Sequence, residues 1–119
     1  MAVHENAVHY LEIVTPDVEA ASKLYGSAHG WTFQERPELG NAFVAEIPGG
    51  GLCGIRAPMH EQEAPIVRPY VRVLDLEAAV KEVAGSGAEI LLESMQIPGH
   101  GTIAIYAHGG IQQGLWQVA

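Results

Sequence analysis

The pentapeptide DVEAA at residues 17–21 recurs as DLEAA at residues 75–79, about half a chain later. Each copy follows a short run rich in β-branched residues, LEIV at 11–14 and VRVL at 71–74. Each copy also precedes a stretch with helical spacing that ends at glycine and leads into a strand-like segment. Four features in the same order predict an internal duplication, in which each half of the chain forms one strand, one helix and three further strands.

Capping chemistry predicts where the two helices begin and end. Thr15 is expected to cap the first helix, with Pro16 in the first helical position, where its missing N–H costs nothing. Gly30 ends this helix. Asp75 is expected to cap the second helix, which ends in the glycine-rich segment 85–87. Each helix carries an apolar stripe that suits packing on a sheet: Val18, Ala21, Leu24 and Tyr25 in the first, and Leu76, Ala79, Val80 and Val83 in the second.

The remaining segments are typical of strands and turns. The strands are expected near residues 31–36, 41–47, 52–56, 70–74, 89–93, 102–107 and 113–118. Because four strands cannot bury a sheet face alone, the two modules should pair. The predicted fold is α+β, with two tandem βαβββ modules that form a curved half-open barrel with the helices outside. Residues 1–119 then make a single domain, with module one at about 8–57, a linker at 58–67 and module two at about 68–118.

The composition excludes several classes of partner. The net charge is -8 and the pI is about 5.0, and the six Lys and Arg residues form no run. We therefore expect neither nucleic-acid binding nor attachment to an anionic membrane. Cys53 is the single cysteine, so no disulfide can form within the chain. No signal peptide and no membrane-spanning segment is recognisable, and a cytoplasmic location is expected.

Several segments resemble the vicinal oxygen chelate superfamily, which includes glyoxalase I, bleomycin-resistance proteins and extradiol dioxygenases. In the first half these are YLEIVTPD at 10–17 and HGW at 29–31. In the second half they are PYVRV at 69–73, IPGHG at 97–101 and GLWQ at 114–117. The resemblance is to a glyoxalase-like subgroup and covers nearly the whole chain. It implies the fold strongly but the chemistry weakly, because this superfamily hosts many reactions.

Metal-dependent members of the superfamily hold their ligands on the first and last strands of each module. The matching positions here are Tyr10, Arg68 or Tyr70, and Gly114. None of these is the His, Glu or Gln that a divalent metal requires. The turn before the last strand also departs from the family pattern, with AHGG at 107–110. No cofactor is therefore predicted, and a divalent metal centre is disfavoured.

Alternation along the strands predicts which side chains face the barrel interior. Leu11 and Ile13 should face the first helix, which turns Tyr10 and Glu12 inward. On the last strand Leu115 should face the second helix. The residues predicted to bind a ligand on the inner face are Tyr10, Glu12, Tyr70, Arg72 and Trp116.

Glu12 is the most informative single residue, because an inward carboxylate must be hydrated, paired or protonated. One interpretation is a structural ion pair with Arg72 or Arg68. The other is a ligand-contacting acid or general base. Arg72 and Tyr70 are open to the same two interpretations, as anchors for an anionic or carbonyl-bearing ligand or as structural partners of Glu12.

The six histidines show none of the spacings typical of metal sites. His4 and His9 are expected to be solvated, with His9 on the outward side of its strand. His100 and His108 lie in loops at the ends of strands, where functional sites tend to form. Together with Glu12 they are the candidate catalytic residues, although the sequence fixes no partner for them.

Two classes of function follow from these features. The first is a metal-independent protein that binds a small molecule on the inner barrel face. The alternative is a metal-dependent lyase, isomerase or dioxygenase whose ligands have moved from the usual strand positions. The resemblance also implies a homodimer, for which exchange of modules through the linker is plausible.

Overall fold

The structure, a computed structural model, describes residues 7–119 and divides the chain into two compact units. The N-terminal unit is Tyr10–Arg68, and the C-terminal unit is Pro69–Ala119 together with the residues up to His9. Eight strands and two α-helices are present in the described residues, with parallel and antiparallel pairing. The fold class is therefore α+β, as predicted.

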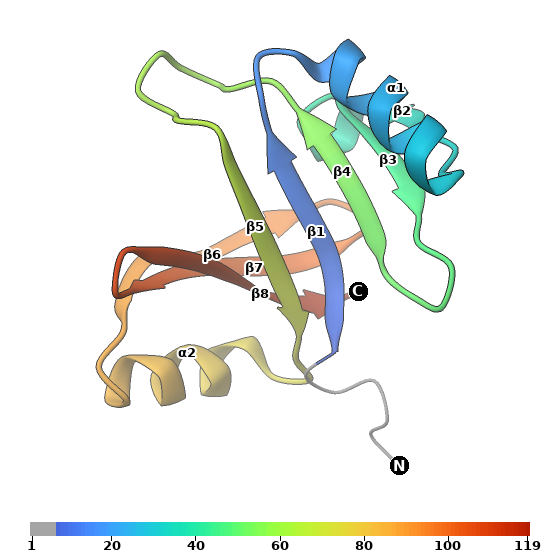
Figure 1. The fold of residues 1–119 in the computed structure, drawn as a ribbon. Coiled ribbons are helices and arrows are strands. Elements are labelled where there is room, and N and C mark those ends of the chain that lie inside the picture. The colour runs from blue at the N-terminus through green and yellow to red at the C-terminus, as the bar shows by residue number, and fades with distance from the viewer. Residues whose placement is uncertain (1–6) are drawn as a thin grey trace. The chain divides into compact units, whose positions relative to one another are not determined.

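The N-terminal unit is a sheet with one helix packed on it (Figure 1). Its elements are β1 (Val8–Val14), α1 (Val18–His29), β2 (Gln34–Arg36), the 3-10 turn η1 (Pro37–Leu39), β3 (Ala42–Glu46) and β4 (Leu52–Arg56). The strand order is β2-β3-β4-β1, and β1 runs parallel to β4. The turn between β3 and β4 closes with a hydrogen bond from Ile47 N to Gly51 O at 3.0 Å, so the two antiparallel strands form a hairpin.

The core of this unit lies between the sheet and α1. Ile13, Cys53 and Ile55 are buried, and Val18 and Tyr25 of the helix pack against them. The predicted alternation of β1 is confirmed, since Leu11 also packs on this side. Leu24 was expected to join the helix stripe, but it is 61% exposed.

The start of α1 differs from the prediction. The helix begins at Val18 with Asp17 as its N-cap, and the Asp17 side chain makes no capping hydrogen bond. Thr15 Oγ1 instead accepts a hydrogen bond from Asp17 N at 3.2 Å. Pro16 therefore belongs to a hydroxyl-stabilised turn that leads into the helix. The end is as predicted, with Gly30 in the left-handed conformation at φ 73°.

The C-terminal unit repeats the same order of elements. These are β5 (Ile66–Arg72), α2 (Leu76–Gly85), β6 (Glu89–Ile97), β7 (Gly101–His108) and β8 (Ile111–Val118). The strand order is β6-β7-β8-β5, and β5 runs parallel to β8. Asp75 caps α2 as predicted, because its Oδ1 accepts a hydrogen bond from Ala78 N at 3.0 Å.

The core of the C-terminal unit confirms the predicted stripe of the second helix. Val73, Leu76, Ala104 and Leu115 are buried together, and the remaining apolar residues of the α2 stripe pack on them. Leu115 thus faces α2, which leaves Gly114 and Trp116 on the other side of β8. All four strands of this unit are longer than predicted. The largest differences are that β5 begins at Ile66, inside the expected linker, and that β6 continues to Ile97 through register shifts.

Candidate functional site

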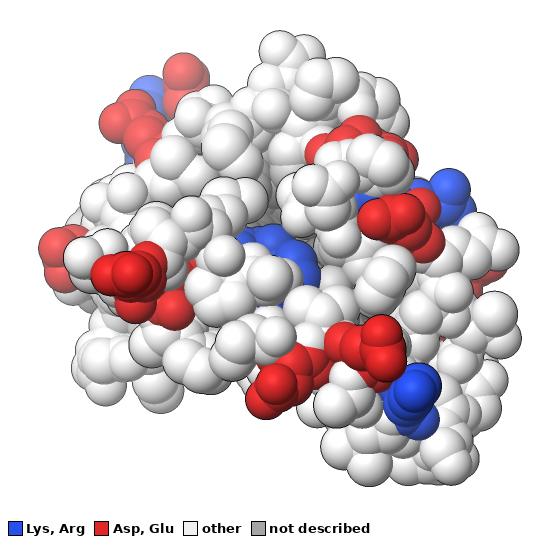
Figure 2. Space-filling model, turned by 90° about the horizontal axis from the view of Figure 1, so that it is seen from above, with Lys and Arg blue, Asp and Glu red and all other residues white. Residues whose placement is uncertain are grey.

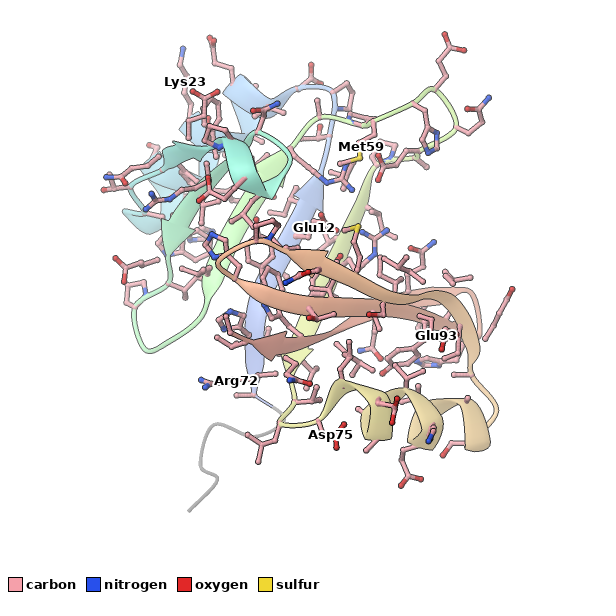
Figure 3. The ribbon with its side chains drawn as sticks, turned by 180° about the vertical axis from the view of Figure 1, so that it is seen from behind. Glu12, Lys23, Met59, Arg72, Asp75 and Glu93 are labelled. Carbon is pink, nitrogen blue, oxygen red and sulfur yellow. The ribbon has the colours of Figure 1, made fainter. Side chains whose placement is uncertain are left out.

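A buried network of charges occupies the N-terminal unit on the side of β1 that faces away from α1. The Glu12 carboxylate accepts a hydrogen bond from Arg56 Nε at 2.9 Å and a short one from Arg68 Nη1. Arg56 also forms two parallel hydrogen bonds to Glu63, at 3.0 and 2.7 Å. Glu12, Arg56 and Arg68 are each at most 9% exposed. Figure 3 shows Glu12 among the strands and Met59 on the loop that follows β4.

The pKa shifts in this network follow from its geometry. The hydrogen bonds from Arg56 lower the pKa of Glu63 to about 2. Burial by itself would lower the pKa of Arg56, but the hydrogen bonds and charges of Glu63 and Glu12 raise it above its ordinary value. Both groups therefore stay charged at neutral pH. Glu63 also accepts a hydrogen bond from Met59 N at 2.7 Å, so the network fastens the loop after β4 to the sheet.

Glu12 forms the kind of buried ion pair that one of the two interpretations predicted. Arg68 is one of its partners, as that interpretation foresaw. Arg56 is a partner that sequence reasoning missed, although alternation could have found it. Cys53 and Ile55 face α1, so Gly54 and Arg56 lie on the same side as Glu12, and Glu12 pairs with Gly54 in the register of β1 and β4.

Each unit places a tyrosine ring over a glycine of a neighbouring strand, and Tyr10, Tyr70 and Gly114 are among the positions that the family resemblance matched to metal ligands. In the N-terminal unit, a Cβ added to Gly54 would collide with the Tyr10 ring. In the C-terminal unit, a Cβ added to Gly114 would collide with the Tyr70 ring. Tyr10 and Tyr70 are 4% and 3% exposed. Both tyrosines are therefore fixed packing elements on the side of the sheet opposite the helix.

A second cluster lies in the C-terminal unit and joins three of the predicted ligand-binding residues. We call it the Arg72 cluster; it consists of His9, Tyr70, Arg72, His100 and Trp116. Trp116 is buried, and its ring meets Tyr70 and His9 edge-on at centroid distances of 5.5 and 5.2 Å. Its Nε1 donates to the backbone carbonyl of His100 at 2.8 Å. Arg72 is the neighbour of Trp116 in the register of β5 and β8.

His9 departs from its expected position in solvent. It is half-buried against Trp116, and burial lowers its pKa below the ordinary 6.5. The nearby charges of Arg72 and His100 lower this pKa further. Strand alternation alone could not predict this position of His9. It gives the face of a strand on which a side chain lies, but not that Trp116 of β8 packs beside the start of β1. The other histidine expected in solvent, His4, lies outside the described residues.

Arg72 differs from most other cations of the chain. Lys23, Lys81, Arg56 and Arg68 each form an ion pair with a carboxylate. Arg72 forms none within residues 7–119, and it is half-buried. Figure 3 shows it at the end of β5. The Arg72 cluster therefore combines a guanidinium that has no carboxylate partner within residues 7–119 with two imidazoles and the rings of Tyr70 and Trp116.

The remaining candidates lie apart from this cluster. His108 is exposed at the end of β7, with its Nε2 3.4 Å from Gln113 Oε1 and its ring stacked on Tyr106. Cys53 is fully buried, and burial raises the pKa of its thiol to about 11, which keeps it protonated and unreactive. Among the described residues no three His, Cys, Asp or Glu side chains gather in a way that could hold a metal ion.

The face drawn in Figure 2 shows no polyanion-binding stripe. On the face drawn in Figure 2, acidic side chains are scattered widely, and Lys and Arg form no continuous band. No helix within residues 7–119 is long and apolar enough to cross a membrane.

Curated relatives share sequence with nearly all of the chain. A Mycobacterium tuberculosis protein provisionally named glyoxylase CFP32 is 30% identical over 117 residues, which cover 92% of this chain and 44% of the relative. The anthracycline biosynthesis protein DnrV of Streptomyces peucetius is 23% identical over 114 residues, covering 82% of this chain and 42% of that protein. The chain thus spans less than half the length of these relatives. No protein-family model matches it.

Solved structures share its fold at low sequence identity. Methylmalonyl-CoA epimerase from Mycobacterium tuberculosis superposes with a TM-score of 0.75 at 17% identity, covering 100% of this chain and 92% of that one. The Streptomyces coelicolor methylmalonyl-CoA epimerase in complex with 2-nitronate-propionyl-CoA superposes with a TM-score of 0.68 at 16% identity, covering 97% and 96%. These likenesses show the fold.

Proposed function

Because the chain belongs to the vicinal oxygen chelate superfamily, we propose that it binds a small organic anion without a metal ion, on the sheet face opposite α2. The Arg72 cluster is the anchor of this site. The observation that carries the proposal is that Arg72 is half-buried beside Trp116 and has no carboxylate partner within residues 7–119. A guanidinium in that position is suited to bind a carboxylate through two parallel hydrogen bonds.

The net charge of the chain supports this choice of ligand. At a net charge of -8, acidic side chains are abundant, and yet none pairs with Arg72 among the described residues. The charges of His100 and Arg72 both act on His9, so the cluster is a local concentration of positive potential. Tyr70 and Trp116 supply the buried aromatic floor of the site. The solved structures with this fold include an epimerase in complex with methylmalonyl-CoA, which is an anionic acyl compound.

The side chains at the positions where a metal ion would be expected support metal independence. The Glu12 carboxylate accepts hydrogen bonds from two arginines. The positions matched to family ligands carry Tyr10, Arg68 or Tyr70, and Gly114, and none of these residues offers an imidazole or a carboxylate. Glu12 and Tyr10 are buried in the N-terminal unit, on the side of its sheet opposite α1.

We also propose that the two units form the tandem modules of a curved half-open barrel with the helices outside. A homodimer is part of the same proposal, as is a cytoplasmic location.

The anion site predicts a specific loss of affinity in an Arg72→Gln variant. The probe is 2-naphthoate, and its dissociation constant is measured by quenching of tryptophan fluorescence on protein dialysed against a chelator. We expect the variant to bind about tenfold to a hundredfold more weakly, because a charge-assisted hydrogen-bonded pair contributes roughly 1.5–3 kcal/mol. Arg36→Gln is the matched control, since Arg36 also lacks a carboxylate partner but is exposed in the other unit.

Two results would contradict the proposal. One is equal affinity in wild type, Arg72→Gln and Arg36→Gln. The other is binding of 2-naphthoate only after Zn²⁺, Mn²⁺ or Fe²⁺ is restored, which would favour the metal-dependent lyase, isomerase or dioxygenase. Binding of 2-naphthalenemethanol, which is neutral, should be weaker and insensitive to Arg72→Gln.

The same site predicts a pH dependence. The pKa of His9 is below 6.5 without ligand, and a bound carboxylate favours the protonated imidazole. Affinity for 2-naphthoate should therefore rise as the pH falls below 6.5 and level off once His9 is protonated in the ligand-free protein as well. The measurement is the dissociation constant from pH about 7.5 to about 5.5. His9→Gln should flatten this pH profile, whereas the matched control His108→Gln should leave it unchanged. A pH profile that His9→Gln does not change would exclude His9 as the source of the pH dependence.

A further inference from the structure

A separate groove lies on the opposite side of the sheet of the C-terminal unit, next to α2. Its volume is about 330 Å³, and α2, β6, β7 and β8 all contribute to its lining. Leu76, Val80 and Thr102 form an apolar floor with one hydroxyl. The groove is distinct from the Arg72 cluster, because Gln117 lines it together with α2 whereas Trp116, the next residue along β8, faces the other way.

The rim of this α2 groove carries more negative than positive charge. Glu77 and Glu93 line it together with Lys81. Lys81 Nζ lies 3.8 Å from Glu77 Oε1, and both side chains are well exposed. Glu93 makes no ion pair within residues 7–119. Figure 3 shows Glu93 on β6 beside α2. One carboxylate therefore remains uncompensated above an apolar floor.

Two backbone amides at the N-terminus of α2, beside the groove, are not available to bind an anion. The amide of Leu76 donates to Gln117 Oε1 at 2.8 Å, and the amide of Ala78 donates to Asp75 Oδ1 at 3.0 Å. These donors, which would otherwise attract an anion, already have partners within the protein. The electrostatics of the groove are thus set by its carboxylates, and they favour a cation.

We propose that the α2 groove binds a small organic ammonium ion with a compact apolar body. The apolar body would lie on Leu76 and Val80, and the ammonium group would pair with Glu93. Its volume is at the lower end of the range for small-molecule sites, so a ligand with a single ring fits better than a nucleotide or an acyl-CoA. The groove would serve as a second site, independent of anion binding at the Arg72 cluster.

The test is an NMR titration of ¹⁵N-labelled protein with cyclohexylmethylamine, cyclohexanecarboxylate and cyclohexylmethanol. These probes share an apolar ring and differ in charge. We expect cyclohexylmethylamine to shift the amide signals of Val80 and Thr102 most strongly. Glu93→Gln should weaken its binding about threefold, as expected for an exposed ion pair. Glu89→Gln is the matched control on the same strand, since Glu89 is exposed and does not line the groove.

Three outcomes would overturn the proposal. Groove signals that do not move with cyclohexylmethylamine up to about 10 mM would exclude the site. Equal shifts with cyclohexanecarboxylate or cyclohexylmethanol would exclude selectivity for cations. Equal weakening by Glu93→Gln and Glu89→Gln would show that only net charge matters. Glu93 and Glu89 are both exposed, so these variants should fold. Unchanged binding of 2-naphthoate would show that the anion site is intact even where the ammonium site fails the test.

Discussion

Replacing Arg56 by leucine is expected to lower the free energy of unfolding by about 3–5 kcal/mol, the usual cost of removing one partner from a buried ion pair. Arg56 is 8% exposed and donates hydrogen bonds to both Glu12 and Glu63. Loss of the Arg56 side chain removes the arginine partner of Glu63 and one arginine partner of Glu12. The loop after β4 also loses its attachment to the sheet. The measurement is urea-induced unfolding at neutral pH.

Arg36→Leu is the control for this variant, because Arg36 is exposed and forms no ion pair within residues 7–119. We expect it to change stability by no more than about 0.5 kcal/mol. A second comparison isolates the pair: Glu63→Gln should destabilise the wild-type protein clearly but change little in the Arg56→Leu background. Equal losses in Arg56→Leu and Arg36→Leu would mean that the network contributes nothing to stability.

Acid should reveal the same network. The pKa of Glu63 is about 2 in the folded protein, against an ordinary value of 4.5. The unfolded chain therefore binds this proton first as the pH falls, and the stabilisation from Glu63 is complete above 4.5 and lost towards pH 2. In the Arg56→Leu protein this part of the acid dependence should be absent.

Gly114→Ala is expected to destabilise the protein by about 3 kcal/mol, at the upper end of the usual cost of overpacking. A methyl group at this position collides with the ring of Tyr70. The ring cannot easily move away, because Tyr70 is 3% exposed and meets Trp116 edge-on. Thermal and urea-induced unfolding would measure the loss.

Gly85→Ala is the matched control, since a Cβ there meets no atom within 4 Å and the residue ends α2 in an ordinary conformation. It should be neutral or slightly stabilising. Gly114→Ala should cost less in a Tyr70→Ala background than in the wild type, because the smaller side chain leaves room for the methyl group. Additive losses in the double variant would contradict the steric explanation.

Local sequence signals predicted most of the secondary structure. The repeated pentapeptide marked both helices, and Asp75 and Gly30 act at their ends as expected. One error arose where side chains compete for the same backbone group. Thr15 accepts from the amide of Asp17 instead of capping the helix, which shifted the start of α1 to Val18. A propensity argument cannot rank such alternatives, because they differ by little free energy.

The candidate sites show a different limit. Alternation correctly turned Leu11, Ile13 and Leu115 towards the helices. It could not say which inward groups would compensate one another. Glu12 and Arg72 were both predicted to contact a ligand, but Glu12 is held by two arginines whereas Arg72 makes no ion pair among the described residues.

The sequence by itself determined the α+β class, the order of the elements and the face on which most side chains lie, because these follow from local periodicity and capping within a few residues. Tertiary structure alone decided that Arg56 and Glu63 complete the network of Glu12, that His9 packs on Trp116 and that tyrosine rings cover Gly54 and Gly114. These contacts join residues far apart in the chain. Their existence depends on strand register and on the balance between desolvation and pairing, and neither is encoded in any short stretch of sequence.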